Sequence, residues 1–366
     1  MELMAIGAFA RQARLSQRAL RLYAELGLLV PAHVDPASGY RFYEPAQLER
    51  ARLVAWLRRL GMPLARIRVI VALPPAAAGA ELAEYWQQAE TDMSARRGLA
   101  TFLIGYLSGK DTVMSEAPTP LAIRYAVKSD TGLERELNED AAYAGPRLLA
   151  VADGLGGHAA GEIASAAAID TLKELDTDVP AGELLNALES AVHQADAALR
   201  DLVEADPSLR GMGTTLTGLM WSGSQLGLVH IGDSRAYLLR DGELFQITHD
   251  HTLVQALIDD GRISAEEAAS HPQRSLLLRA LDGQSSEPDL QLREARPGDR
   301  YLLCSDGLSS VVPGDAIARV LSGTAEPNEG VAALVDLANQ AGGPDNITCI
   351  IADVVPMPDP AATVSG

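Results

Sequence analysis

The feature that most constrains this 366-residue chain is a set of aspartates placed where strand-like runs meet glycine-containing turns. The first follows the apolar run 148–152 and is Asp153, in the sequence LLAVADGLGGHAAG. Asp233, Asp306 and Asp345 occupy similar positions later in the chain. One such aspartate is usually an ordinary turn residue, because its side chain bonds to its own backbone. Four of them in one acidic region predict a cluster that cations neutralise, and oxygen ligands favour hard ions such as Mg²⁺ or Mn²⁺.

Charge is distributed unevenly along the sequence. Residues 1–75 contain eleven arginines and five acidic residues, whereas residues 111–366 contain sixteen basic and forty acidic residues. The first region is suited to docking on phosphates, and the second would repel a nucleic acid. Hydrophobic residues make up 47% of the chain, which is enough to build packed cores and argues against disorder over most of its length.

The two cysteines, Cys304 and Cys349, both lie in apolar strand-like runs. This placement is typical of buried thiols in a reducing compartment, and neither cysteine has the glycine-rich anion-binding loop of a cysteine phosphatase. No apolar run is long enough to cross a membrane, and the N-terminus lacks the pattern of a signal peptide. We therefore expect a cytoplasmic protein that is not associated with a membrane.

Residues 1–75 have the pattern of a small helical module. Apolar residues recur at helical spacing over 6–25, and Ser16 is the expected N-cap of the second of two helices. A turn at 35–39 precedes a short alternating strand at 40–43. Two further helices are expected at 47–59 and 64–73, separated by Gly61-Met62-Pro63.

Three motifs of this module, LRLYAELGLL, SGYRFY and LRRLGMPLARI, occur in order. Over residues 3–73 they resemble the winged helix-turn-helix DNA-binding domain of the mercury-resistance-regulator (MerR) family. The resemblance implies an all-α winged helix-turn-helix whose second helix enters the major groove of double-stranded DNA. It implies that Arg18 and Arg21 face the DNA and that Tyr23, Tyr40 and Arg41 contact phosphate.

The end of the second helix departs from the MerR pattern. Paired aromatics followed by Glu-Glu are usual there, and this sequence has Leu22-Tyr23 followed by Ala24-Glu25. The departure removes some of the phosphate contacts that the family makes. Two alternatives to DNA binding therefore stand: the arginines form a solvated helix face, or the module recognises a protein.

Residues 76–120 are expected to connect two domains. After a break at 74–79, apolar residues from Leu82 to Tyr106 follow one helical stripe. Such a stripe predicts a partner helix, and a homodimer formed through it would place two recognition helices on a two-fold DNA site. The alternative is that the stripe packs against the chain's own domains. We expect a linker at 108–120 and a disordered tail at 356–366.

Residues 121–355 combine short strand-like runs with long helical stretches. The expected strands cover 122–127, 148–152, 214–220, 225–231, 235–239, 300–304 and 348–354, and the expected helices cover 162–174, 181–204 and 330–341. Strands that cluster with helices inserted around them predict an α+β fold with a mostly antiparallel sheet.

Eight motifs in this second region stand in the order and approximate spacing of the bacterial type 2C (PPM family) metal-dependent serine/threonine protein phosphatases. They are ERELNEDA, VADGLGGH, GMGTTLTGL, VHIGDSRAYLLRDG, ITHDHT, HPQRSLLLRAL, LLCSDGL and GPDNITCIIADVV. The resemblance covers 121–355 and implies a four-layer αββα sandwich of two antiparallel sheets. It also implies hydrolysis of phosphoserine and phosphothreonine in proteins by a hydroxide that bridges two metal ions.

The same resemblance implies a role for individual residues. Asp153 would bridge two Mn²⁺ or Mg²⁺ ions, with further ligands from the carbonyl of Gly154 and from Asp306 and Asp345. A third ion would be held by Asp306 together with Asp233 and Ser275. Arg135 would bind the substrate phosphate, and Glu139 and Asp140 would orient metal-bound waters.

The position after Asp153-Gly154 is a departure from eukaryotic relatives, which have a histidine there that is thought to protonate the leaving oxygen. This chain has Leu155, so the general acid stays open, and a metal-bound water is one candidate. His158 is expected to support the turn or face solvent. His249 and His251 match no ligand of the family and are expected to be polar loop residues. The alternative to an enzyme is a transcription regulator whose phosphatase-like domain acts mainly as a sensor.

Overall fold

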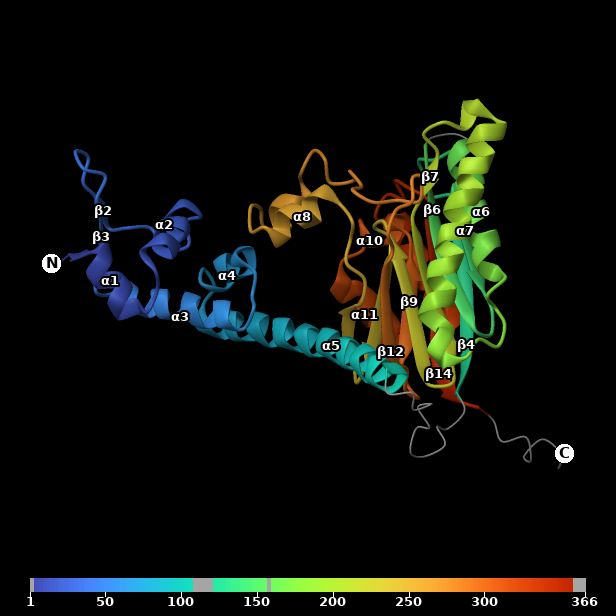
Figure 1. Cartoon of the computed structure of the whole chain (residues 1–366), viewed down its shortest axis with the longest axis horizontal. Coiled ribbons are helices and arrows are strands. Elements are labelled where there is room, and N and C mark those ends of the chain that lie inside the picture. Colours follow the sequence, from blue (N-terminus) through green and yellow to red (C-terminus); the bar gives the residue numbers. More distant parts are fainter. Residues whose placement is uncertain (1–2, 108–120, 157–158, 358–366) are drawn as a thin grey trace. The chain divides into compact units, whose positions relative to one another are not determined.

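The computed structural model describes residues 3–107, 121–156 and 159–357 (Figure 1). They form two compact units, one made of Met1–Gln87 with Thr252–Leu276 and the other of Gln88–His251 with Leu277–Gly366. Each unit has its own hydrophobic core. The expected linker and most of the expected tail lie outside the described residues. Among the residues described, no helix combines the length and apolar character needed to span a bilayer.

The N-terminal unit contains short helices and a small antiparallel sheet of order β1-β3-β2. Phe9 and Tyr43 stack at its centre with ring centroids 4.5 Å apart, and the Ser16 side chain caps α2 by accepting from the Ala19 amide. The expected winged helical module is thus present, and two short strands that the sequence did not predict, β1 and β2, pair with the wing strand. The elements are α1 (Ile6–Ala13), α2 (Gln17–Glu25), α3 (Gln47–Arg59), α4 (Leu64–Ile70), β1 (Met4–Ala5), β2 (His33–Val34) and β3 (Arg41–Tyr43).

A single helix, α5 (Pro75–Leu107), replaces the break expected at 74–79. Proline is well tolerated in the first turn of a helix, where its missing N–H has no intrahelical partner. Segment 252–276, which also belongs to the N-terminal unit, contributes α8 (Leu253–Asp259) and α9 (Ala265–Ala269).

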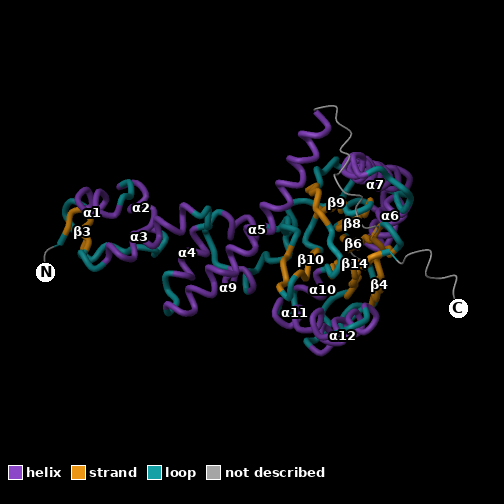
Figure 2. Tube along the Cα trace, turned by 90° about the horizontal axis from the view of Figure 1, so that it is seen from below, coloured by secondary structure: helices purple, strands orange, loops and turns teal. Residues whose placement is uncertain are grey.

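The larger unit is a sandwich of two antiparallel sheets with helices outside each sheet (Figures 1 and 2). One sheet has the order β11-β10-β13-β14-β4, and the other has the order β12-β9-β8-β6-β5, with β7 paired to β6. Its strands are β4 (Leu121–Asp130), β5 (Asp140–Ala144), β6 (Leu148–Leu155), β7 (Gly213–Thr214), β8 (Leu216–Ser222), β9 (Gln225–Ile231), β10 (Arg235–Arg240), β11 (Glu243–Gln246), β12 (Asp289–Glu294), β13 (Arg300–Cys304) and β14 (Ile347–Pro356).

Three hydrophobic clusters hold these layers together. Leu149, Val151 and Ile350 belong to the cluster between the two sheets. A second cluster joins one sheet to α6 and α7, and a third joins the other sheet to α11 and α12. The result is the αββα architecture expected from the sequence. The helices are α6 (Ala159–Lys173), α7 (Leu184–Ala205), α10 (Asp306–Ser309), α11 (Gly314–Gly323) and α12 (Pro327–Gln340), with 3₁₀ turns at Ala181–Glu183 and Pro207–Leu209.

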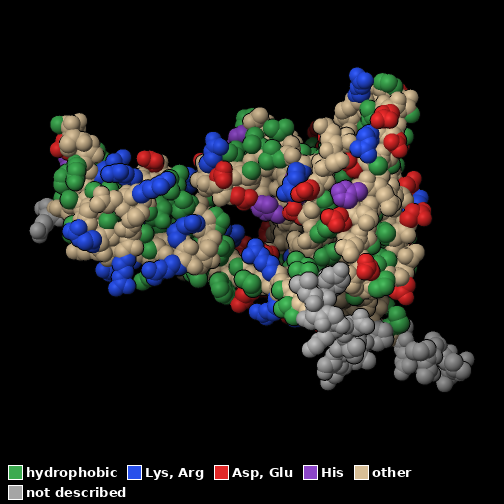
Figure 3. All heavy atoms as spheres, in the orientation of Figure 1, with side chains coloured by type: hydrophobic (Ala, Val, Ile, Leu, Met, Phe, Trp, Pro, Cys, Tyr) green, Lys and Arg blue, Asp and Glu red, His purple; other side chains and the backbone are tan. Residues whose placement is uncertain are grey.

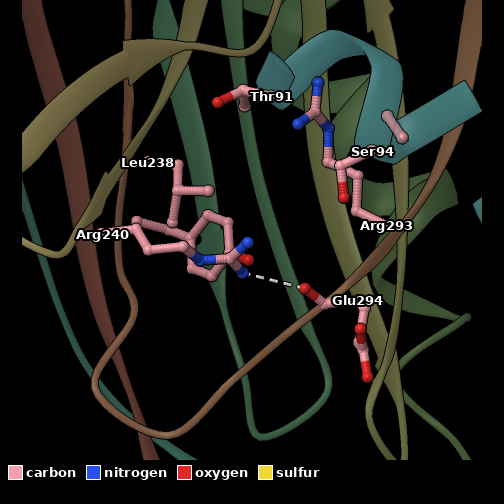
Figure 4. Close-up of a pocket in the computed structure, with 8 residues that line it drawn as sticks. Thr91, Ser94, Leu238, Arg240, Arg293 and Glu294 are labelled. Carbon is pink, nitrogen blue, oxygen red and sulfur yellow. Dashed lines mark hydrogen bonds between the residues drawn. The ribbon is translucent and has the colours of Figure 1, made fainter. Parts of the chain in front are cut away.

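The C-terminal part of α5 packs on the sandwich itself. Ala95 is buried, and the Gln88 side chain donates to the carbonyl oxygen of Gln246. Thr91 and Ser94 line a small pocket together with Arg240 and Arg293 of the sheets (Figure 4). Of the apolar stripe itself, Leu82 and Tyr85 pack against the core of the N-terminal unit, which supports the alternative that the stripe contacts the chain's own domains, while Met93 and Leu103 are exposed. A homodimer stays a prediction.

Both cysteines are free and buried, on neighbouring strands where Cys304 faces Cys349 in register. Burial raises the pKa of Cys304 to about 12. A thiol with such a pKa stays protonated at neutral pH and is a poor nucleophile.

Candidate metal centre

Asp153 lies near the end of β6, where its backbone is fixed on both sides. Its amide donates to Thr215 Oγ1 at 3.0 Å, and its carbonyl oxygen accepts from the Thr215 amide at 2.9 Å. Asp140 of β5 is its direct partner across the strand pair. These contacts place two carboxylates side by side at one edge of the sheet.

Asp306 reaches the same region from the other sheet, as the first residue of α10. The preceding residue, Ser305, donates from its hydroxyl to Asp140 Oδ2 at 2.7 Å and from its amide to the Thr348 carbonyl at 3.0 Å. Gly307 lies so close to the carbonyl oxygen of Asn346 that a Cβ would not fit. The junction of β13 and α10 is therefore packed tightly against the start of β14.

Asn346 organises the loop that carries two of the predicted site residues. Its Oδ1 accepts from the Glu139 amide at 2.8 Å, and its Nδ2 donates to the carbonyls of Thr131 and Leu137 at 2.9 and 2.8 Å. Arg135, on this loop, donates from Nη2 to Asp345 Oδ2 at 2.7 Å. The structure thus brings Arg135, Glu139 and Asp345 to the carboxylate region.

Asp233 is linked to the same region through hydroxyl groups. Ser234 Oγ lies 2.7 Å from Thr215 Oγ1, which itself accepts from the Asp153 amide. The neighbouring Arg235 makes an ion pair with Asp250, with Nη2 and Oδ2 2.6 Å apart. This ion pair fixes the start of β10 beside Asp233.

The aspartates of this region raise one another's pKa values. Burial is the largest cause, followed by repulsion from neighbouring carboxylates. Repulsion by Asp306 and Asp345 helps to raise the pKa of Asp140 to about 7. Repulsion by Asp306 and Asp250 helps to raise the pKa of Asp233 to about 7. The pKa values of Asp153 and Asp306 are raised as well. Ionising all of these groups together is unfavourable unless a cation neutralises them.

The donor set fits divalent cations. It consists of carboxylate oxygens, and Asp140 Oδ1 is buried without a hydrogen-bond partner in the described ranges 3–107, 121–156 and 159–357. Among the residues that the structure describes, however, no three acidic, histidine or cysteine side chains already close around one point. Arg135 engages Asp345, one of the predicted ligands. The individual ligand assignments therefore stay predictions.

Two further predicted ligands have different surroundings. Gly154 donates from its amide to the Glu139 carbonyl at 3.1 Å, and a Cβ there would overlap the carbonyl oxygen of Gly161. Ser275 lies in segment 252–276 and so belongs to the N-terminal unit.

Leu155 is the last residue of β6, and His158 lies outside the described residues.

The histidines near this region form a structural network. His251 is buried, its Nδ1 accepts from the Gly232 amide at 3.1 Å, and its Nε2 lies 3.2 Å from Asp289 Oδ2. His230 is fully buried with its ring 4.8 Å from that of His251, and its Nε2 donates to the carbonyl oxygen of His249. His251 lies in a loop, as expected, and is buried there. Its interactions support the loop that carries Asp233.

Sequence reasoning missed the parts of the site that hold the carboxylates in place. Asn346, Ser305 and Thr215 carry most of the hydrogen bonds described above. The available signal was their position, because each is a polar residue adjacent to or within a motif that also contains glycine or aspartate.

Comparison with known proteins gives two family matches. Residues 134–340 match Protein phosphatase 2C, and residues 4–73 match the MerR HTH family regulatory protein. The chain belongs to the protein phosphatase 2C family. Its N-terminal residues form a MerR-family helix-turn-helix domain.

The phosphatase 2C part is similar to curated bacterial proteins. A serine/threonine protein phosphatase, PstP, of Mycobacterium tuberculosis is 58% identical over 239 residues, which are 65% of this chain and 46% of that protein. The chain therefore spans about half the length of that relative. A serine/threonine phosphatase, stp, of Listeria monocytogenes is 35% identical over 236 residues, which are 62% of this chain and 94% of the relative.

Solved structures agree with the fold described above. The crystal structure of M. tuberculosis PstP/Ppp superposes with a TM-score of 0.63 and 57% identity, covering 64% of this chain and 99% of that one. The PstP catalytic domain in complex with two manganese ions gives a TM-score of 0.61 and 56% identity, with the same coverage. The α+β sandwich predicted from the sequence is thereby confirmed.

The predicted DNA-contacting residues of the MerR-family domain differ in exposure. Arg18, Arg21 and Tyr40 are exposed, and Arg41 is half-buried. Tyr23 is buried in the core of the unit. Figure 3 shows basic side chains gathered over the N-terminal helices, while acidic side chains are frequent over the sandwich. The role of each residue in DNA binding stays a prediction.

Proposed function

We propose that this chain hydrolyses phosphoserine and phosphothreonine in proteins with the help of divalent cations. The observation that carries the proposal is the set of half-buried aspartates, Asp140, Asp153, Asp233 and Asp306, whose pKa values are raised by burial and by one another. Membership of the phosphatase 2C family supports it. The substrates would be phosphorylated proteins.

The residues would divide the work between metal binding and substrate binding. Two divalent cations bound by Asp153, the Gly154 carbonyl, Asp306 and Asp345 would supply the charge that activates a water for in-line attack on phosphorus. Asp140 and Glu139 would orient water through hydrogen bonds. Arg135 would hold the phosphate oxygens with its planar guanidinium group, which requires it to exchange its present partner, Asp345.

The identity of the cations is proposed from a relative. The structure of the PstP catalytic domain contains two manganese ions. We propose Mn²⁺ or Mg²⁺ for this chain, and a third ion stays a prediction. Leu155 has no proton to give, so the leaving oxygen would be protonated by water in the site.

The N-terminal domain would tether this activity to double-stranded DNA. The net positive charge of residues 1–75, with Arg18 and Arg21 exposed on α2, supports the proposal. A homodimer would present two such helices to a two-fold site. The cytoplasm, where DNA and phosphoproteins are both accessible, is the proposed location.

Replacing Asp153 with asparagine tests the phosphatase proposal. Asp153→Asn keeps the size of the side chain but removes the charge, and we expect it to lower Mn²⁺-dependent release of phosphate from a phosphothreonine peptide by about 100-fold or more. Asp170→Asn is the matched control, because Asp170 is exposed on α6 and pairs only with Lys173 in the interactions described. Wild-type turnover in Asp153→Asn at saturating Mn²⁺ would refute the assignment.

The sensor alternative makes a different prediction for the unmodified chain. A transcription regulator that only senses a phosphoprotein or a metal would bind Mn²⁺ and phosphopeptide without releasing phosphate. The same assay on the wild-type chain therefore separates an enzyme from a sensor.

A further inference from the structure

Segment 252–276 belongs to the compact unit that contains the MerR-family domain, although in sequence it lies between two strands of the phosphatase sandwich. No residue of its helix α8 is buried. Residues 253–258 are half-buried, and Gly261 and Ala268 are buried, so the segment depends on packing against neighbouring elements. Its contacts with α4 of the MerR-family domain therefore matter for its order.

One contact is an ion pair between Arg68 of α4 and Glu267 of α9. Arg68 Nη2 lies 2.8 Å from Glu267 Oε2, and the same oxygen accepts from the Ser264 amide at 2.6 Å. Ser264 in turn accepts from the Glu267 amide, which completes a capping box. Arg68 thus binds the Glu267 carboxylate, which is part of the capping box at the start of α9. The helices α4 and α9 lie side by side (Figure 2).

A second contact is the close approach of the Gly261 backbone to the start of α4. Gly261 is buried and has a φ of +73°. A Cβ at this position would lie 3.2 Å from Leu64 Cβ and 3.4 Å from the Ala65 amide nitrogen. The turn between α8 and α9 therefore rests directly on the first residues of α4, and glycine suits both its conformation and its space.

The base of the segment leads by covalent continuity to the candidate metal centre. Leu253 donates to the Leu276 carbonyl at 2.9 Å and closes the base. The adjoining residue on the sandwich, His251, accepts from the Leu278 amide through its carbonyl oxygen and from the Gly232 amide through Nδ1. Gly232 immediately precedes Asp233.

We propose that the MerR-family domain acts on the phosphatase by holding segment 252–276 through α4. While it is held, the segment is ordered in advance, and substrate or metal binding need not supply the free energy of ordering it. A ligand or DNA that weakens the hold of α4 would lower phosphatase efficiency. By linkage, occupancy of the phosphatase site would change the affinity of the MerR-family domain for its own ligand. The inference rests on the proposed phosphatase activity.

Charge reversal at Arg68 in the full-length chain tests the proposal. Arg68→Glu places two negative charges together, and we expect amide hydrogen exchange in 252–276 to become about threefold faster or more. We expect kcat/KM for a phosphothreonine peptide to fall about two- to fivefold, the size expected for removal of a partly exposed ion pair. The double variant Arg68→Glu/Glu267→Lys restores an opposite-charge pair and should recover part of both effects.

Arg66→Glu is the matched control. Arg66 lies on the same helix but pairs with Glu81 and Glu84 of α5, so its reversal should leave exchange in 252–276 and kcat/KM unchanged. The proposal is wrong if Arg68→Glu and Arg66→Glu give the same exchange, or if exchange accelerates in Arg68→Glu while kcat/KM stays at the wild-type value. A wild-type chain without turnover would refute the proposed function instead, and the exchange comparison does not need catalysis.

Discussion

At the scale of single residues, the candidate centre depends on an amide side chain as much as on carboxylates. Asn346 uses both ends of its side chain to fix the loop that contains Arg135 and Glu139. A carboxylate at this position could accept from the Glu139 amide but could not donate to two carbonyl groups. Asn346 therefore provides the support of the loop, while the adjacent Asp345, a predicted ligand, pairs with Arg135.

His230 should make the stability of the sandwich depend on pH. Burial, and then the neighbouring His251, lower its pKa to about 4 in the folded chain, whereas an unfolded histidine titrates near 6.5. Between these values the unfolded state binds a proton that the folded state does not. This group's contribution is therefore complete above about pH 6.5 and is lost as pH falls towards 4, by about 3 kcal/mol.

Chemical denaturation of wild-type and His230→Gln chains between pH 4 and 7, followed by a probe of the sandwich, measures this contribution. The variant should lose less unfolding free energy than the wild type as the pH falls. Parallel curves for the two chains would show that His230 does not titrate as the buried structure requires.

At the scale of elements, the junction between β13 and α10 is the most tightly constrained part of the site. Gly307 has no room for a Cβ because the Asn346 carbonyl oxygen lies against it. Gly307→Ala should therefore destabilise the sandwich by about 1–3 kcal/mol, because β14 must shift to accommodate the methyl group.

Gly314→Ala provides the matched control for this element. Gly314 starts α11, and a Cβ there would meet nothing within 4 Å. This change should be neutral or slightly stabilising, because alanine favours helix. Equal thermal stability of the two variants would contradict the packing described for the junction.

The sequence predicted most accurately the elements that are continuous apolar runs between turns. The strands at 225–231 and 300–304 have the bounds predicted, since both are apolar runs between clear turns. The start of α5 at Pro75 differs from the break that the Pro74-Pro75 pair predicts, because proline also fits a first helical turn. β1 and β2 were missed because a two-residue strand has no period, and its pairing depends on distant residues.

The candidate site was predictable to a similar extent. Asp153, Asp233 and Asp306 stand out because each ends an apolar run, whereas Asp140 is expected only from the family resemblance. The structure brings these four aspartates close enough to shift one another's pKa values. The supporting bonds of Asn346 and Ser305 depend on residues more than 160 positions away along the chain. The membership of 252–276 in the N-terminal unit depends on tertiary contacts that no local pattern contains.

At the scale of the whole molecule, a basic domain is joined to an acidic one, and this asymmetry predicts how DNA binding responds to salt. Arg18 and Arg21 are exposed on one helix of the basic domain. Arg18→Ala/Arg21→Ala should weaken binding to double-stranded DNA. It should also reduce the slope of log affinity against log salt by about one for each phosphate that an arginine no longer neutralises.

Arg52→Ala is a control for this prediction, since Arg52 lies on α3 and outside the predicted DNA-contacting set. Fluorescence anisotropy at several salt concentrations gives both the affinity and the slope. If the wild-type chain shows no salt-dependent affinity for DNA, the N-terminal domain does not bind DNA, and recognition of a protein becomes the better hypothesis.

The proposed chemistry depends above all on Asp153 lying between two divalent cations in a phosphatase site. Anomalous X-ray scattering from crystals of the full-length chain grown with Mn²⁺ tests this placement most directly. We predict two manganese peaks that both lie within coordination distance of the Asp153 carboxylate, with Asp306 and Asp345 on one of them. Manganese bound elsewhere, or peaks that do not contact Asp153, would contradict it.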